Sequence, residues 1–192
     1  MITVAIVFVV IATILCAAAL LALLGIGHLG LSGPDALARD GLARGQPAPA
    51  WTLADSAGRP HSCPPARPLQ LIVFADHSLK SFPSVVAGLR ALLGDADLEI
   101  VILTRGPAEH AEPVLGQLGL AGVPVLTGSP ASYGRYNVRV MPFAIFVDSA
   151  GRVRASSLVN HDWQLAKLRQ VAAIPVGADE VAGRRRRLAM AG

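Results

Sequence analysis

The chain has 192 residues, of which 53% are hydrophobic, and it carries a formal net charge of +4 at pH 7. Residues 1–34 contain no Asp, Glu, Lys or Arg, so all 30 of these charged side chains fall in the remaining 158 residues. The apolar residues are therefore concentrated at the amino end, and the remainder has the size of one small domain with its own core. This distribution argues against a polytopic transporter, a disordered chain, a multidomain enzyme and a disulfide-rich scaffold.

The first expected element is a membrane-spanning helix at residues 2–24. This stretch is almost wholly apolar, and about 20 such residues suffice to cross a bilayer. It lacks the basic start of a cleaved signal peptide, so we interpret residues 1–30 as an uncleaved transmembrane anchor and residues 31–44 as a linker. The basic residues that follow it, Arg39 and Arg44, favour a cytoplasmic position for the domain by the positive-inside tendency.

Apolar runs that alternate with turn signals predict an α/β domain over residues 45–174. We expect, in chain order, a strand at 51–53, a strand at 69–74, a helix at 81–93, a strand at 97–104, a helix at 108–118, an extended piece at 123–126, a short helix at 130–136, a hairpin of strands at 143–147 and 153–159, and a helix at 162–171. The segments LQLIVF and DLEIVILT have the composition of strands that are buried on both faces. This order indicates a mixed sheet with helices on both faces.

Two segments of this domain resemble membrane-anchored thiol–disulfide oxidoreductases of the TlpA/ResA and MauD-like types. GQPAPAWTLADSAGRP (45–60) is similar to the segment G-x-x-A-P-x-F-x-L-x-D-x-x-G that opens their domain. YGRYNVRVMPFAIFVDSAGRV (133–153) is similar to their segment Y-x-V-x-x-x-P-x-x-F-x-I-D-x-x-G-x-V. The resemblance covers residues 45–173 and implies a thioredoxin-like fold. It also implies a domain on the extracytoplasmic side of the cell membrane, and on this point we follow it over the two arginines.

The same resemblance implies that Met141–Pro142 is a cis peptide bond, which in the family lies beside the redox cysteines and offers backbone groups to an extended substrate. The family places its C-x-x-C motif at the start of the helix after the first buried strand, where the first thiolate is the nucleophile. In this sequence Leu79-Lys80-Ser81-Phe82 occupies those positions. Disulfide exchange by the family's route is therefore not possible.

Cys16 and Cys63 are the two cysteines of the chain. Cys16 lies in the apolar segment, and Cys63 lies in a Pro-rich segment that we expect to be a loop, so no disulfide between them is expected. Neither belongs to a Cys pair or a Cys/His cluster with zinc-ligand spacing, and we expect no metal and no cofactor. Cys63 is the catalytic candidate of an alternative function, a single-cysteine thiol oxidoreductase or antioxidant protein, in which the nearby His61 would favour the thiolate.

Leu79 and Phe82 take the positions at which the family has its two redox cysteines. The polar, reactive rim that those cysteines form would therefore be apolar in this chain. Together with Met141 and Pro142, Leu79 and Phe82 form the predicted binding groove. We expect the chain to be a non-catalytic binding or scaffolding protein with a protein or peptide partner at this groove. Loss of the motif by drift in a redundant copy is the alternative. The segment 76–78 (DHS) is interpreted as a polar turn that caps the next helix and not as a catalytic triad.

The carboxyl end contains four of the 17 basic residues, Arg184 to Arg187. Without them the chain has 13 basic and 13 acidic residues, so the folded part is formally neutral. It lacks the basic face of a nucleic-acid-binding domain, and we expect no nucleic-acid partner. We interpret residues 175–192 as a flexible, solvated basic tail, with attraction to anionic lipid headgroups as the alternative. A third interpretation is an anchor that merely presents this tail.

Overall fold

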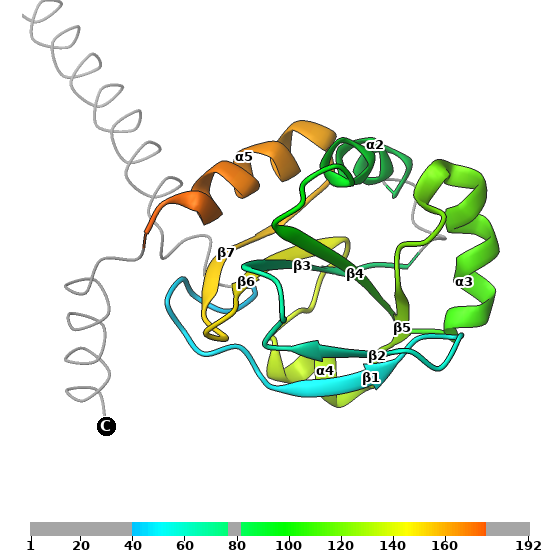
Figure 1. Ribbon diagram of the computed structural model, residues 1–192, viewed down its shortest axis with the longest axis horizontal. Coiled ribbons are helices and arrows are strands. Elements are labelled where there is room, and N and C mark those ends of the chain that lie inside the picture. The colour runs from blue at the N-terminus through cyan, green and yellow to red at the C-terminus, as the bar shows by residue number, and fades with distance from the viewer. Residues whose placement is uncertain (1–39, 77–81, 176–192) are drawn as a thin grey trace, which may run out of the picture. The chain divides into compact units, whose positions relative to one another are not determined.

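The computed structural model describes residues 40–76 and 82–175 of the chain (Figure 1). The predicted anchor at 1–30, the tail after residue 175 and the groove candidate Leu79 lie outside the described residues. Within the described ranges, no helix is both long and apolar enough to cross a membrane.

A five-stranded mixed sheet forms the centre of the described domain. Its strands, in the order in which they lie side by side, are β5 (Val125–Thr127), β4 (Leu98–Thr104), β3 (Leu69–Phe74), β6 (Phe143–Asp148) and β7 (Val153–Leu158). β3, β4 and β5 pair in parallel, whereas β6 pairs antiparallel with both β3 and β7. The mixed sheet predicted from the order of elements is confirmed.

Strand β3 separates two hydrophobic cores. Leu71 and Val73 pack in one core, Ile72 and Phe74 pack in the other, and all four side chains are fully buried. Successive side chains of a strand point to opposite faces, so a strand that is covered on both faces must be apolar at nearly every position. This requirement explains why the segment has no regular alternation of polar and apolar residues.

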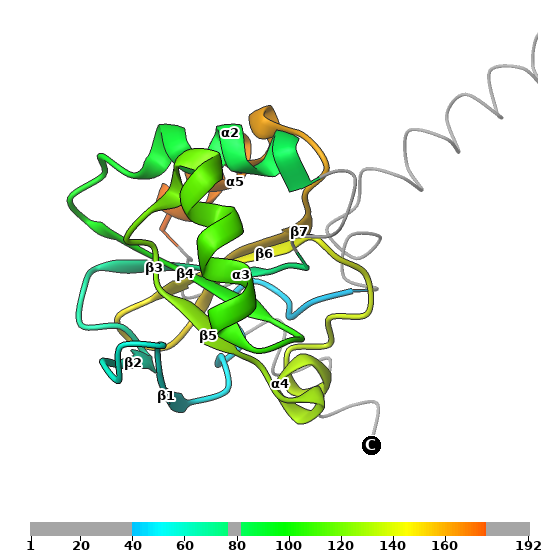
Figure 2. The same cartoon turned by 90° about the vertical axis from the view of Figure 1, so that its right-hand side faces the viewer.

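Helices cover one face of the sheet, and a helix and a hairpin cover the other (Figure 2). The first face carries α2 (Phe82–Leu92), α3 (Ala108–Leu115) and α5 (Asp162–Ala173). The second face carries α4 (Pro130–Arg135) and the two-stranded hairpin of β1 (Trp51–Ala54) and β2 (Pro60–Cys63). The predicted arrangement with helices on both faces is confirmed, but β2 was not expected.

The helix expected at 108–118 ends differently. α3 ends at Leu115, and the segment that follows, η2 (Gly116–Leu120), is kinked at Gly119, which has a φ angle of +77°. A residue in the left-handed region cannot continue a right-handed helix, and glycine adopts this conformation without a steric cost. Gly119 therefore ends the helical segment and turns the chain toward β5.

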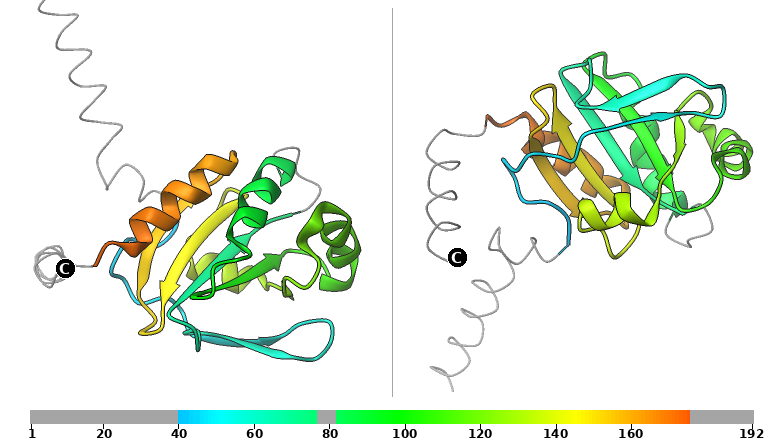
Figure 3. Two further views of the ribbon diagram at one scale, coloured as in Figure 1. Left: turned by 45° about the horizontal axis from the view of Figure 1, so that its top comes forward. Right: turned by 90° about the horizontal axis from the view of Figure 1, so that it is seen from below.

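Residues 40–44, which we assigned to the linker, lie against the domain. The Gly45 N–H donates to the carbonyl oxygen of Val153 at 2.7 Å, and the Ser156 hydroxyl donates to that of Leu42 at 2.7 Å. Figure 3 shows this segment, in blue, beside β7. The segment thus covers part of the outer edge of the sheet, so the packed domain begins before residue 45.

Candidate functional site

The peptide bond between Met141 and Pro142 is cis, as the resemblance implied. It lies directly before β6, and the next residue, Phe143, pairs with Phe74 at the carboxyl end of β3. In the chain, this end of β3 leads to residues 79–82, where the C-x-x-C motif of the family would stand. The cis bond therefore lies at the end of the sheet where the resemblance places the site.

The main chain around the cis bond is hydrogen-bonded on one side only. The Val159 N–H donates to the Pro142 carbonyl oxygen at 3.0 Å, whereas neither main-chain group of Met141 has a hydrogen-bond partner within the described residues. Met141 is half-buried, and the side chain of Val140 before it is 48% exposed. A free N–H and C=O can pair with the main chain of a second polypeptide, and neighbouring apolar side chains can contact that polypeptide's side chains.

Phe82 does not line an exposed groove, contrary to our expectation. It is the first residue of α2, its side chain is 1% exposed, and it packs in the core between α2 and the sheet. Phe82, Val85, Val86 and Leu89 follow the spacing that places apolar side chains on one face of a helix, and all four are buried. Because Leu79 lies outside the described residues, the described part of the candidate groove consists of the half-buried Met141 and the buried Pro142, with the exposed Val140 beside them. Pro142 therefore contributes the shape of the main chain and not an exposed side chain.

Cys63 is the last residue of β2 and does not lie in a loop, contrary to our expectation. It pairs with Trp51 across the hairpin, and its side chain is 2% exposed. The segment PHSC has few residues of high strand propensity, so its pairing with β1, and not its composition, makes it a strand. A second cis peptide bond, Cys63–Pro64, follows directly.

The surroundings of Cys63 disfavour its thiolate. Burial raises the pKa of the Cys63 thiol, hydrogen bonding with the Tyr136 hydroxyl opposes this effect, the charge of Glu99 adds to it, and the net result is an increase. His61 was expected to favour the thiolate, but its ring nitrogens face Asp55 and Glu99 instead. A reactive cysteine requires the opposite combination, a lowered pKa and access to solvent.

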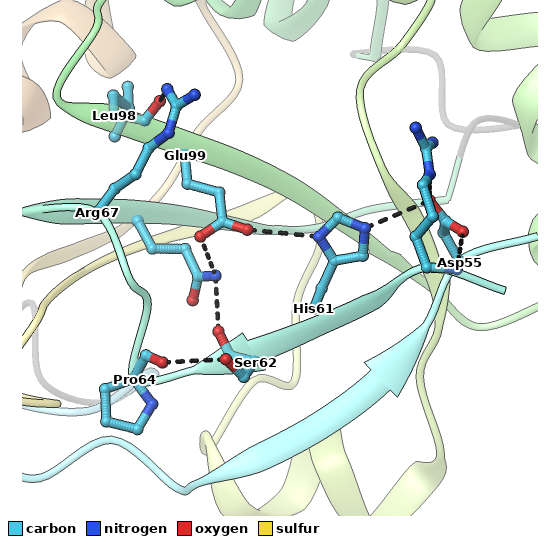
Figure 4. Close-up of polar contacts among 9 residues, drawn as sticks. Asp55, His61, Ser62, Pro64, Arg67, Leu98 and Glu99 are labelled. Carbon is cyan, nitrogen blue, oxygen red and sulfur yellow. Dashed lines mark hydrogen bonds and ion pairs between the residues drawn. The ribbon is translucent and has the colours of Figure 1, made fainter. Parts of the chain in front are cut away.

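Asp55, His61 and Glu99 form a line of polar side chains between the hairpin and the sheet (Figure 4). His61 Nε2 lies 3.3 Å from Asp55 Oδ2, and His61 Nδ1 lies 3.4 Å from Glu99 Oε1. The Gln70 amide donates to the other carboxylate oxygen of Glu99 at 3.2 Å and to the Ser62 carbonyl oxygen at 3.0 Å. Gln70 and Glu99 belong to β3 and β4, so this polar network joins the hairpin to two adjacent parallel strands of the sheet.

Asp55 also holds the turn that links β1 to β2. Burial acts to raise the pKa of Asp55, but hydrogen bonds from the Arg59 main chain and from the His61 and Arg59 side chains, together with the charge of Arg59, lower it to about 2. Arg59 Nε lies 2.8 Å from Asp55 Oδ2, and the Asp55 side chain is 1% exposed. The carboxylate therefore remains ionised inside the protein and fixes the turn.

The polar network lacks the arrangement of a catalytic site. A cavity of about 300 Å³ adjoins it, lined by His61, Glu99, Arg67 and the loop 122–124 among others. Both ring nitrogens of His61 face carboxylates, so neither is placed to take a proton from a nucleophile. Among the side chains that the structure describes, no group of three His, Cys, Asp or Glu residues could hold a metal ion. We interpret the network as the attachment of the hairpin to the sheet.

Gln70 and Glu99 were not predicted from the sequence as members of a polar network. Each is the polar second residue of an otherwise mostly apolar strand, and the two are register partners in the parallel pair of β3 and β4. Polar residues at matching positions of two buried strands are the signal that could have identified the polar network.

Several solved structures share this architecture. The thioredoxin domain of a thiol-disulfide oxidoreductase from Bacteroides vulgatus is similar with a TM-score of 0.52 and 20% sequence identity, over 66% of this chain and 97% of that chain. A protein assigned as the thiol:disulfide interchange protein DsbE from Chlorobium tepidum has a TM-score of 0.57 and 18% identity, over 68% and 95% of the two chains. For a peroxiredoxin-like protein from Aquifex aeolicus the TM-score is 0.55 and the identity 12%, over 68% and 88%. No protein-family model and no curated protein matches the sequence.

The described domain therefore has a thioredoxin-like α/β fold, which confirms the predicted fold class of the domain. Its structural neighbours include thiol–disulfide oxidoreductases of this fold, all at low sequence identity. At such identity the likeness identifies the fold, and the activity has to be argued from the residues of this chain.

Proposed function

We propose that this chain is a membrane-anchored thioredoxin-like protein that binds a polypeptide segment beside the Met141–Pro142 bond and does not exchange disulfides. The observation that carries the proposal is the state of this loop, which combines a cis bond with a Met141 main chain that has no hydrogen-bond partner within the described residues. Val140 adds an exposed apolar side chain. Leu79 belongs to the proposed site by its sequence position alone, and Phe82, a core residue, does not belong to it.

The proposal excludes disulfide exchange because that reaction needs a thiolate that can reach a disulfide. The chain has no C-x-x-C motif, and Cys63 is 2% exposed and has a raised pKa. These observations also speak against the alternative function, a single-cysteine oxidoreductase or antioxidant protein.

Apolar side chains near the loop favour a partner segment that is itself apolar. Trp163, which is 57% exposed, lies in the first turn of α5, shortly after Val159. Val159 donates the hydrogen bond to Pro142, so Val140 and Trp163 belong to the two chain segments that this bond joins. Exposed large apolar side chains on two segments that are joined in this way support an apolar partner segment.

We further propose that residues 2–24 anchor the protein in the cell membrane and that the domain faces the extracytoplasmic side. The uncharged apolar run supports the anchor, and the family resemblance supports the side. Fusions of two reporters after Gly192 test the orientation, one active only after export and one active only in the cytoplasm. Activity of the exported reporter alone is expected, and activity of the cytoplasmic reporter alone would contradict the proposed side.

Binding is tested with an unfolded polypeptide that cannot take part in disulfide exchange. Fluorescently labelled lactalbumin, reduced and carboxymethylated at every cysteine, is titrated against the full-length chain in detergent, and its anisotropy is measured. We expect Val140→Glu to weaken binding by about tenfold or more, because it places a charge in an apolar contact. Leu93→Glu is the matched control, since Leu93 is also exposed, at 45%, but lies after α2, near the amino end of β4. Equal loss of affinity in both variants, or in neither, would contradict the proposed site.

A further inference from the structure

β5 lies at the edge of the five-stranded sheet and pairs with β4 through alternate residues. The Pro124 carbonyl oxygen accepts a hydrogen bond from the Ile102 N–H at 2.9 Å, and the Gly128 N–H donates to the Thr104 carbonyl oxygen at 2.9 Å. Leu126 lies midway between Pro124 and Gly128, so its N–H and C=O also pair with β4 in this parallel register. Every second residue of β5 therefore faces β4.

Val125 and Thr127 lie between these positions, so their N–H and C=O groups point away from β4. None of these four groups has a hydrogen-bond partner within residues 40–76 and 82–175. An edge of this kind offers free donors and acceptors to the main chain of another polypeptide. The sheet can therefore be extended at β5 by one more strand.

A cavity of about 380 Å³ adjoins this edge and is lined by Val125. It lies where α3 and the turn of the hairpin flank β5 (Figure 2). Leu115 and Leu120 contribute apolar surface to the cavity, and Ser56 and Glu112 contribute polar groups. The Ser56 hydroxyl donates to the Glu112 carboxylate at 2.6 Å, so the hairpin turn and α3 meet beside the cavity. A side chain of an added strand would thus find an apolar recess with a carboxylate beside it.

Glu112 gives the cavity an uncompensated negative charge. Arg59, the other charged residue that lines the cavity, is paired with the Asp55 carboxylate at 2.8 Å. Glu112 contacts the neutral hydroxyl of Ser56, and among the described side chains it has no cationic partner. A lysine or arginine of a partner would therefore complement Glu112.

We propose that the outer edge of β5 binds a single extended polypeptide segment, which adds to the sheet as a strand and directs a basic side chain toward Glu112. Its main chain pairs with Val125 and Thr127, and an apolar side chain enters the cavity. A second copy of the domain fits less well. Pairing of two β5 strands around a two-fold axis would set α3 against α3 and bring two Glu112 carboxylates to the same face.

This site is separate from the loop of the proposed function. β4 and β3 lie between β5 and β6, the strand that follows Pro142. The inference therefore adds a second binding surface and does not depend on the first.

The probe is the capped peptide Val-Lys-Val-Lys-Val, compared with Val-Glu-Val-Glu-Val. Hydrogen exchange of the isotope-labelled full-length chain in detergent is followed by NMR at millimolar peptide. We expect the lysine peptide to slow exchange of the Val125 and Thr127 amides by about tenfold or more, because they become hydrogen-bonded. The Leu126 amide, already bonded to β4, should not change. The lysine peptide with every amide N-methylated should give no protection, because it cannot donate to the edge.

Two charge variants test the role of Glu112. Glu112→Lys should reverse the preference, so that the glutamate peptide protects the Val125 and Thr127 amides better than the lysine peptide. Glu109→Lys is the matched control, because Glu109 is exposed on the same helix but does not line the cavity, and it should keep the original preference.

Three outcomes would overturn the inference. The first is that neither peptide protects the two amides. The second is protection by the lysine peptide that is lost in Val140→Glu and unchanged in Glu112→Lys, which would assign the peptide to the Met141–Pro142 loop. The third is protection that rises with protein concentration in the absence of peptide, which would assign the edge to a second copy of the chain.

Discussion

The Tyr136 hydroxyl lies 3.5 Å from the Sγ atom of Cys63 in the interior of the domain. The same hydroxyl accepts a hydrogen bond from Trp51 Nε1 at 2.9 Å and donates one to the Pro49 carbonyl oxygen at 3.0 Å. Tyr136 follows the last residue of α4, and it is 0% exposed where Cys63 is 2% exposed. The contact therefore joins the hairpin to α4 and leaves the thiol inside a packed interface that a disulfide substrate does not reach.

Cys63 is expected to resist thiol reagents in the folded protein. Iodoacetamide in mildly alkaline buffer should modify Cys63 at least about 100-fold more slowly in the native full-length chain than in urea, because the thiolate is the reactive form and burial both shields it and raises its pKa. Mass spectrometry of the digested protein distinguishes Cys63 from Cys16. Native modification at the rate of the unfolded chain would show that the thiol is accessible.

Gly41 tests whether residues 40–44 belong to the folded domain. It has a φ angle of +84°, and a Cβ atom at this position would overlap the Phe143 ring. Gly41→Ala should lower the free energy of unfolding by about 2–4 kcal/mol, measured by urea denaturation in detergent. Gly94→Ala is the control, because Gly94 has open space around it and should change stability by no more than about 0.5 kcal/mol. Equal stability of the two variants would place residues 40–44 outside the packed domain.

The Asp55 carboxylate should make stability depend on acid pH. Its pKa is about 2 in the folded protein against an ordinary value of 3.8, so its contribution is complete above the unfolded pKa and is lost as pH falls through the folded one. The urea midpoint of the full-length chain should therefore fall as the pH is lowered from about 5 toward 2.

Two variants isolate this effect of Asp55. Asp55→Asn should lower the urea midpoint at neutral pH. Its further decline in acid should be smaller, because the asparagine side chain carries no charge that acid could remove. Glu109→Gln, which changes an exposed carboxylate, should keep the decline of the unmodified chain. If Asp55→Asn declined as steeply as the unmodified chain, the acid sensitivity would arise elsewhere.

The stability of a Phe82 variant shows whether Phe82 is a core residue or a groove residue. Because it is 1% exposed among the apolar residues of α2 and the sheet, Phe82→Ala should cost about 3–5 kcal/mol of unfolding free energy. Val140→Ala, at an exposed position, should cost no more than about 0.5 kcal/mol. If Phe82→Ala lowered the free energy of unfolding only slightly, Phe82 would not be a core residue and would again be a candidate for the groove.

The sheet could be predicted because burial on both faces imposes a composition that is visible in the sequence. The segment LQLIVF has the predicted bounds 69–74, and the hairpin of β6 and β7 differs from its predicted bounds by one residue at the end of each strand. In β3 and β6, which are buried at nearly every position, tertiary burial and local composition favour the same structure, so the pattern is sufficient. The cis bond at Pro142 was implied only by the family resemblance.

Other features depend on contacts that no local pattern shows. β2 exists because Pro60–Cys63 pairs with β1, and its own residues have low strand propensity. At Phe82 two signals disagreed, since the resemblance placed the residue at the redox site whereas its spacing from Val85, Val86 and Leu89 predicts a core position. The structure follows the spacing. The polar network of Asp55, His61 and Glu99 also includes Gln70, and the pairing of Gln70 with Glu99 depends on the register of β3 against β4, which no local pattern shows.

Disulfide reduction tests most directly the central claim that this thioredoxin-like domain binds without exchanging disulfides. Insulin is incubated with dithiothreitol and the full-length chain in detergent, in parallel with the Cys63→Ser variant and with an active thioredoxin as positive control. We expect neither protein to raise the rate of insulin reduction above that of dithiothreitol alone. Turnover by the unmodified chain that disappears in Cys63→Ser would make Cys63 the catalytic residue of a single-cysteine enzyme and would contradict the claim.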